Sequence, residues 1–137
     1  MDDPLYSKPL LRLAALAAGA GRLEPCDAQG SAHNPVCGDK ISVTLHLEDG
    51  RLVQMAHQTQ ACVLTQASAS ILGAHLTGNR QDVEALHRQV GAMLRGGDVP
   101  PAPFAEYAAL IGAASHRNRH KCVLLPLDAV LDALSNG

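Results

Sequence analysis

One stretch of the chain alternates strictly between apolar and polar residues. Over residues 41–48, apolar side chains occupy the odd positions and polar side chains the even positions, which is the period of a half-buried β-strand. Asp49-Gly50 follows at once, and this dipeptide is a strong signal for a tight hairpin turn. We therefore expect residues 52–60 to return as the antiparallel partner strand.

A helix is expected before this hairpin. Leu10, Leu13 and Leu16 repeat at helical spacing. Pro9 suits the first turn of that helix, where its missing N–H group costs little. Residues 22–36 are rich in turn-forming side chains, and they predict a connection that contains one short edge strand.

The pattern after the hairpin is helical. Asn79 and Asp82 have the spacing of a capping box at the start of one helix, and Pro126 is expected in the first turn of the last one. Four helices are predicted in this part of the chain. Three of them cover residues 66–76, 104–114 and 125–134, and the other follows the capping box, carries an apolar stripe from Val83 to Met93 and ends at residues 95–97. Strands come first and helices after, so the fold class is α+β. We expect a small antiparallel sheet of about three strands, packed against several helices in a single domain that spans residues 1–137.

Composition narrows the classes of function. The chain of 137 residues is 47% hydrophobic and 18% charged, as in globular domains. Only 2% of the residues are aromatic and the net charge is −2, so no nucleic-acid partner is expected. The apolar run over residues 10–20 is too short to span a bilayer, so no membrane partner is expected either. Four cysteines without a secretory signal indicate a reducing compartment, and we expect the protein to be cytoplasmic.

The segment over residues 33–40 carries the first candidate chemistry. Cys37 and Asp39 flank Gly38, which lets the backbone bend so that both side chains can face one point. A thiolate and a carboxylate that converge in this way indicate a site for a cation.

Two later cysteines extend this hypothesis. Cys62 follows the returning strand, which brings it back toward Asp39, and Cys122 comes just before the last predicted helix. Three thiols and one carboxylate can then form a four-ligand set, and soft thiolates select zinc, Cu(I) or iron–sulfur clusters. The spacing alone leaves open that these cysteines are ordinary buried residues. Cys26 lies in a polar run, and we interpret it as incidental.

Three motifs occur in order along the chain. They are NPVCGD at residues 34–39, ACVLTQASAS at residues 61–70 and HKCVLLP at residues 120–126. Together they resemble the U-type iron–sulfur cluster assembly scaffolds, a family that includes IscU, SufU and the N-terminal domain of NifU. The resemblance runs from about residue 5 to the end of the chain, and it implies the same α+β fold.

The resemblance also implies a function. It makes Cys37, Asp39, Cys62 and Cys122 the ligands of iron in a 2Fe–2S cluster, held on a scaffold that passes the cluster to apo-proteins. The implied partners are a cysteine desulfurase and apo iron–sulfur proteins or carrier proteins. Cys122 is the candidate sulfur acceptor, because the basic residues that precede it favour its thiolate form.

Departures from the IscU type keep an alternative open. Lys121 stands where IscU-type members carry histidine, and His120 lies one residue further back. The lysine and the long helical insert between Cys62 and Cys122 look more like the SufU type, whose members bind zinc and accept sulfur from a cysteine desulfurase. The alternative is therefore a zinc-dependent sulfurtransferase, which would be an enzyme, whereas a scaffold would not. A structural zinc protein without a transfer role is the third hypothesis. We expect His120 to lie behind the ligands or to be exposed.

Overall fold

A three-stranded antiparallel sheet forms one layer of the protein, in a computed structural model that describes residues 6–36 and 38–136. The sheet has the order β1-β2-β3, with β1 at Ala28–Asn34, β2 at Asp39–Glu48 and β3 at Arg51–Gln60. Asp49 and Gly50 form the two-residue turn between β2 and β3, with φ angles of 52° and 77°. The predicted hairpin is confirmed, and the predicted edge strand is β1.

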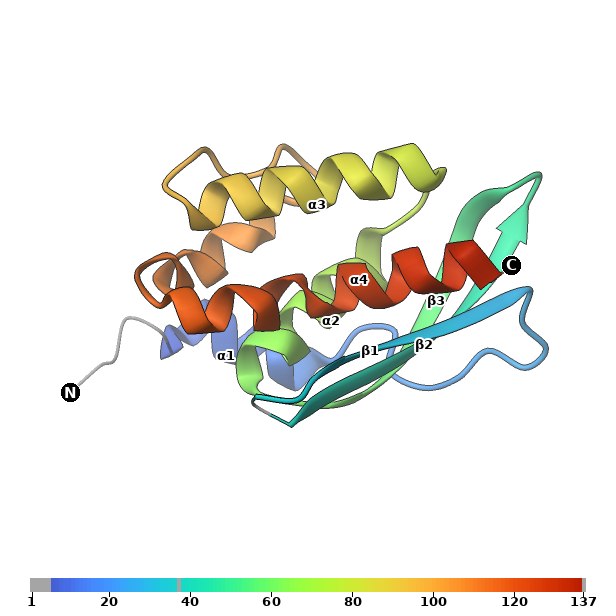
Figure 1. The fold of residues 1–137 in the computed structure, drawn as a ribbon, viewed down its shortest axis with the longest axis horizontal. Helices are drawn as coiled ribbons and strands as arrows, with labels where there is room; N and C mark the ends of the chain where they lie inside the picture. The colour runs from blue at the N-terminus through green and yellow to red at the C-terminus, as the bar shows by residue number, and fades with distance from the viewer. Residues whose placement is uncertain (1–5, 37, 137) are drawn as a thin grey trace.

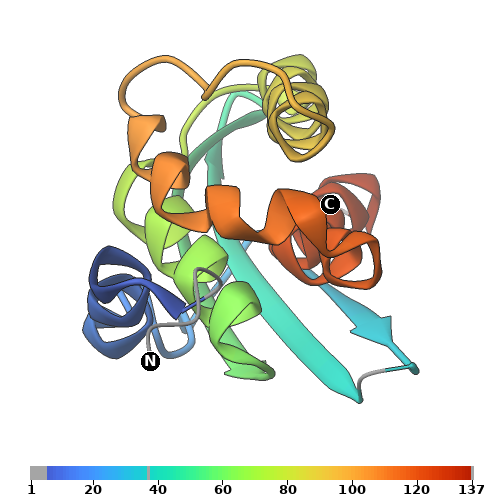
Figure 2. The ribbon, with the colours of Figure 1, turned by 90° about the vertical axis from the view of Figure 1, so that its left-hand side faces the viewer.

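Helices cover one face of this sheet. They are α1 (Lys8–Leu16), α2 (Val63–His75), α3 (Arg80–Leu94), α4 (His120–Asn136) and two 3-10 segments, η2 (Ala105–Ser115) and η3 (Arg117–Arg119). α2 and α4 lie against the sheet and α1 lies beside α2, while α3 and η2 form an outer layer (Figures 1 and 2). The fold is α+β, as predicted. Within the described ranges, every helix falls short of the length and hydropathy that crossing a bilayer requires.

The helix boundaries correct several predictions. The capping box of Asn79 and Asp82 is present at the start of α3, but α2 begins at Val63, three residues earlier than predicted. The helix predicted over residues 104–114 is the 3-10 segment η2.

The last helix also begins earlier than predicted. α4 starts at His120, so Pro126 lies inside the helix and not in its first turn. A proline has no N–H group for the carbonyl four residues earlier, which in α4 is the carbonyl of Cys122. The hydroxyl of Thr65 in α2 donates to this carbonyl at 2.9 Å. The helix can continue through the proline because a side chain of another helix satisfies the freed acceptor.

α4 lies close along β1. A Cβ atom at Gly30 would come within 2.3 Å of the α4 backbone, so only glycine fits at this position without a shift. Asp132 accepts a hydrogen bond from the Ser31 N–H at 2.9 Å, and the Asn136 amide donates to the Gln29 carbonyl at 3.2 Å. Side chains of α4 therefore form hydrogen bonds with backbone N–H and carbonyl groups of this edge strand.

Two loop segments cover the other edge of the sheet, along β3. Leu52 exchanges backbone hydrogen bonds with Gly78 at 2.7 and 3.0 Å. His57 donates its N–H to the Gly19 carbonyl at 2.9 Å and accepts from the Gly21 N–H at 2.8 Å. The segment that follows α1 is therefore fastened to the sheet at His57.

The side chain of His57 strengthens this attachment. It is only 3% exposed, and its Nε2 donates to the Ala18 carbonyl while its Nδ1 accepts from the Thr59 hydroxyl, each at 2.9 Å. Burial lowers the pKa of His57, because a charged imidazolium would lose its hydration, and the Ala18 carbonyl opposes this only in part. The folded protein therefore favours the neutral ring.

We expect acid to destabilise the fold through His57. Its pKa in the unfolded chain is about 6.5, and its pKa in the folded protein is lower. Its contribution to stability is therefore fully present above pH 6.5 or so and is lost as the pH falls below that value. Urea unfolding of the metal-free protein between about pH 5 and pH 8 measures this loss. The dependence of the unfolding free energy on pH should be weaker in His57→Gln. It should be unchanged in His116→Gln, which replaces an exposed ring. An equal slope in wild type and His57→Gln would show that another group is responsible.

Candidate metal centre

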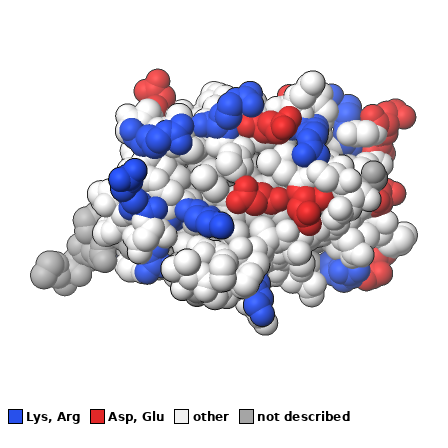
Figure 3. Space-filling view, in the orientation of Figure 1, with Lys and Arg blue, Asp and Glu red and all other residues white. Residues whose placement is uncertain are grey.

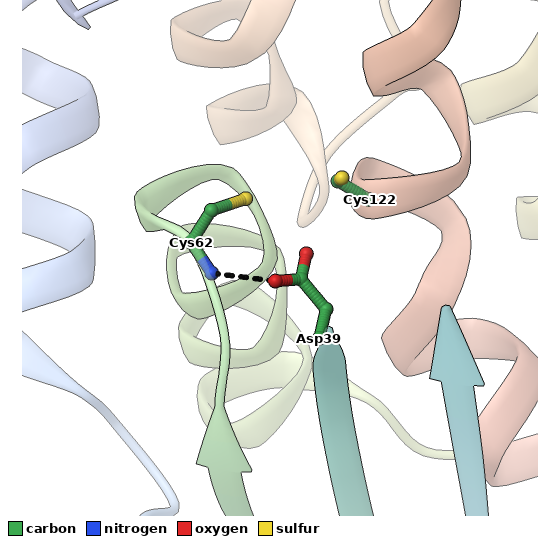
Figure 4. Close-up of side chains that lie close together, drawn as sticks. All are labelled: Asp39, Cys62 and Cys122. Carbon is green, nitrogen blue, oxygen red and sulfur yellow. Dashed lines mark hydrogen bonds between the residues drawn. The ribbon is translucent and has the colours of Figure 1, made fainter. Parts of the chain in front are cut away.

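Three of the predicted ligand residues meet at one end of the sheet. Asp39 is the first residue of β2, Cys62 lies two residues after β3, and Cys122 is the third residue of α4. The antiparallel pairing of β2 with β3 brings Asp39 and Cys62 to the same end, and α4 begins beside them. One carboxylate oxygen and the two sulfur atoms lie within 4.8 Å of one another. Figure 4 shows the Asp39 carboxylate between the two cysteine side chains.

Cys37, the fourth predicted ligand, lies outside the described residues, and its role stays a prediction. The structure does describe its surroundings in the chain. Asn34 and Asp39 form the last pair of the β1–β2 ladder. Gly38 has a φ of 74° and donates its N–H to the Asn34 carbonyl at 2.8 Å. The predicted bend at Gly38 is confirmed.

The group of three is buried on its inner side and more open at Cys62. Asp39 is 4% exposed and Cys122 is fully buried, whereas Cys62 is partly exposed. Cys62 is also the N-cap residue of α2, and its N–H donates to Oδ1 of Asp39 at 3.2 Å. This bond holds the carboxylate against the start of α2.

The hydroxyl of Thr65 lies directly behind these residues. Its Oγ1 is 3.2 Å from Oδ2 of Asp39, 2.9 Å from the carbonyl oxygen of Cys122 and 3.6 Å from Sγ of Cys62. Thr65 is not among the site residues predicted from the sequence, because the predicted helix starts at residue 66 and α2 starts at Val63. A helix that begins at Val63 puts Thr65 one turn from Cys62, on the same side.

Asn34 is a second residue that sequence reasoning missed. Its side chain is 3% exposed, and its Nδ2 donates to Sγ of Cys122 at 3.9 Å. Its Oδ1 accepts from the Val36 N–H at 3.2 Å, which shapes the start of the segment that leads to Cys37. The sequence does offer one indication, since Asn34 directly precedes the segment of residues 35–39, which contains the candidate ligands Cys37 and Asp39.

Arg119 adds a positive charge beside the two sulfur atoms. Burial lowers the pKa of Arg119, but its neighbours Tyr6, Cys62 and Cys122 raise it by more, and a hydrogen bond to the Cys122 side chain contributes. The net effect is a pKa above the usual value, so Arg119 is held in its charged form.

The positive charge continues on the surface around this end of the protein. Arg117 and Lys121 are exposed on either side of Arg119. Figure 3 shows basic side chains around the end where α4 begins, while most acidic side chains on that face lie toward the other end. A negatively charged group would therefore be attracted to the end that carries Asp39, Cys62 and Cys122.

Two other candidates from the sequence lie apart from this group. His120 is half-buried, and its ring contacts the Ala114 carbonyl at 3.0 Å, so it fastens the end of η2. Cys26 precedes β1, and the next residue, Asp27, donates its N–H to the carbonyl of Leu45 far along β2 from Asp39.

The donors of the group fit a thiophilic metal. Two sulfur atoms and one carboxylate oxygen are suited to zinc or to iron in a sulfide cluster, whereas calcium and magnesium prefer sites made of oxygen atoms alone.

Comparisons with known proteins show the family of the chain and agree with its fold. Residues 5–122 match the family model of the NifU-like N terminal domain. The chain belongs to this family. The iron–sulfur cluster assembly scaffold protein IscU of Thermotoga maritima is 26% identical over 131 residues, which cover 95% of this chain and 92% of the relative. The IscU of Streptococcus pyogenes is 28% identical over 119 residues, covering 85% of this chain and 74% of that protein.

Solved structures of NifU-like proteins have the same architecture. The N-terminal NifU-like protein of Brucella abortus, described as nitrogen-fixing, superposes with a TM-score of 0.89 at 30% identity, covering 97% of this chain and 94% of that one. A putative SUF-system scaffold protein from Fervidobacterium islandicum has a TM-score of 0.85 at 19% identity, covering 98% and 99%, and it supports the fold alone. The resemblance to iron–sulfur cluster assembly scaffolds is therefore confirmed at the level of the family.

Proposed function

We propose that this chain is a cytoplasmic scaffold on which iron and sulfur are combined into a 2Fe–2S cluster. Cys37, Asp39, Cys62 and Cys122 would hold the cluster, which is the cargo of the protein and not a permanent cofactor. The observation that carries the proposal is the meeting of Asp39, Cys62 and Cys122 within 4.8 Å, in a member of the NifU-like family. A cysteine desulfurase would supply the sulfur, and apo iron–sulfur proteins or carrier proteins would receive the cluster.

The exposure of the site supports a role in transfer. Cys122 and Asp39 are buried, but Cys62 is partly exposed, so thiols of a recipient could reach the cluster from that side. Asp39 offers a hard oxygen donor among soft thiolates, which is a weaker match for iron in a sulfide cluster. We propose that this weaker ligand makes the cluster easy to release.

Replacing Asp39 should change the lifetime of the cluster. In Asp39→Ala the weakly matched oxygen is gone, and we expect the cluster to persist several-fold longer and to pass several-fold more slowly to an apo-ferredoxin. Anaerobic reconstitution with ferrous iron, L-cysteine and a desulfurase, followed by the decay of visible absorption, measures both rates. Asp98→Ala, which changes an exposed carboxylate in the loop after α3, is the control. Faster loss of the cluster from Asp39→Ala would refute this role of Asp39.

The positive charge of Arg119 favours a second candidate function, a zinc-dependent sulfurtransferase. Arg119 makes a hydrogen bond to the side chain of Cys122, and a neighbouring cation favours a thiolate. The Cys122 thiolate would attack the outer sulfur of a persulfide on the desulfurase. A new S–S bond forms on Cys122, the S–S bond of the donor breaks, and the donor cysteine leaves as a thiolate.

Trapping the sulfur tests the role of Cys122, and the bound metal separates the two functions. After anaerobic incubation with the desulfurase and L-cysteine, we expect mass spectrometry to find one added sulfur on the peptide that contains Cys122. Cys122→Ser should lose the modification and Cys26→Ser should keep it. A persulfide on another cysteine, with Cys122 unmodified, would contradict the assignment, and Cys37 is the next choice. Retained zinc without a chromophore would favour the sulfurtransferase, whereas a cluster spectrum would favour the scaffold.

A further inference from the structure

Thr65 is the point where α2 meets the other segments that carry ligands. Its side chain is fully buried, and its single hydroxyl contacts the carboxylate of Asp39, the carbonyl of Cys122 and the sulfur of Cys62. We infer that Thr65 positions Asp39 and Cys122 and thereby sets how tightly the site holds a thiophilic metal ion. This inference rests on the proposed function of the site as a metal centre.

The hydroxyl has more partners than protons. It can donate one hydrogen bond, and its oxygen can accept others. The Cys122 carbonyl at 2.9 Å and Oδ2 of Asp39 at 3.2 Å are both acceptors, so they share this one donor. The thiol of Cys62, whose sulfur lies 3.6 Å away, can donate to the same oxygen. A change at Thr65 therefore reaches all three segments together.

The Cys122 carbonyl lacks its usual helical donor because of a proline in α4. Pro126 lies four residues further along the helix and has no N–H to give. Without the Thr65 hydroxyl, the carbonyl of a fully buried residue would lose the donor that replaces this missing group. The backbone that carries the Cys122 sulfur would then be less firmly held.

The Asp39 carboxylate is held from two sides. The Cys62 N–H donates to Oδ1 at 3.2 Å, and the Thr65 hydroxyl lies at 3.2 Å from Oδ2. Hydrogen bonds of this kind fix the orientation of a ligating carboxylate, and their removal typically weakens metal binding by about 10–100-fold. Removal of the Thr65 hydroxyl leaves Oδ2 free to turn away from the two sulfur atoms.

Ser68 provides a matched control on the same helix. It is also fully buried, and its hydroxyl donates to the Val123 carbonyl of α4 at 2.8 Å and pairs with the hydroxyl of Tyr107 at 2.7 Å. Ser68 thus makes the same kind of bond between α2 and α4 as Thr65. Its hydroxyl contacts Val123 and Tyr107, and neither of these residues is a predicted ligand.

The test compares Co²⁺ and Zn²⁺ binding by the metal-free forms of wild type, Thr65→Val, Thr65→Ser and Ser68→Ala. Valine keeps the shape of threonine without the hydroxyl, and serine keeps the hydroxyl. We expect Thr65→Val to weaken Zn²⁺ binding by about 10–100-fold in competition with a chelator, and to change the Co²⁺ ligand-field spectrum. Thr65→Ser and Ser68→Ala should keep the wild-type spectrum and nearly the wild-type affinity.

Each other outcome has a distinct meaning. Wild-type binding by a folded Thr65→Val would overturn the inference, and so would equal weakening by Ser68→Ala, which would point to the general docking of α2 on α4. If valine prevents folding, Thr65→Ala, which only removes atoms, makes the same comparison. Failure of wild type to bind either ion would overturn the proposed metal site itself, and this inference with it.

Discussion

The hydrogen bond between the Thr65 hydroxyl and the Cys122 carbonyl joins the two helices on which the candidate site depends. The carbonyl is available because Pro126 interrupts the ladder of α4. In an uninterrupted helix, a backbone N–H of α4 would bind this carbonyl. The hydrogen bond from Thr65 would then contribute less to holding α2 against the start of α4. One turn further along α2, Ser68 makes the equivalent bond to the Val123 carbonyl. Two successive hydroxyls of α2 thus donate to successive carbonyls of α4, and the first of them replaces the donor that Pro126 lacks.

The sheet supplies the remaining part of the arrangement. β2 starts at Asp39 and β3 ends just before Cys62, so the register of one hairpin decides the distance between carboxylate and thiol. Asn34, at the end of β1, reaches across to the sulfur of Cys122. Asn34 in β1, Asp39 in β2 and Cys62, two residues after β3, therefore lie at the same end of the sheet. The candidate site combines the end of β2 with the starts of α2 and α4, which carry Asp39, Cys62 and Cys122.

The sequence predicted what local rules control and missed what distant contacts decide. The turn at Asp49-Gly50 and the capping box at Asn79 were predictable because their residues lie next to one another in the chain. The antiparallel pairing of β2 with β3, which follows from the predicted turn, was enough to predict that Asp39 and Cys62 lie close together. Thr65 was missed because the start of α2 was predicted too late, and because two of its three partners, Asp39 and Cys122, are 26 and 57 residues away. The position of Pro126 was misjudged for the same reason, since the donor that lets α4 continue through it comes from α2.

The two edges of the sheet limit how another protein can approach. Gly78 and the segment of residues 19–21 occupy backbone groups of β3, while Asp132 and Asn136 occupy those of Ser31 and Gln29 on β1. A partner strand would have to displace these bonds before it could extend the sheet. Recognition by strand addition is therefore disfavoured along these stretches. Partners are left to bind through side chains, and near Cys122 these include the basic residues Arg117, Arg119 and Lys121.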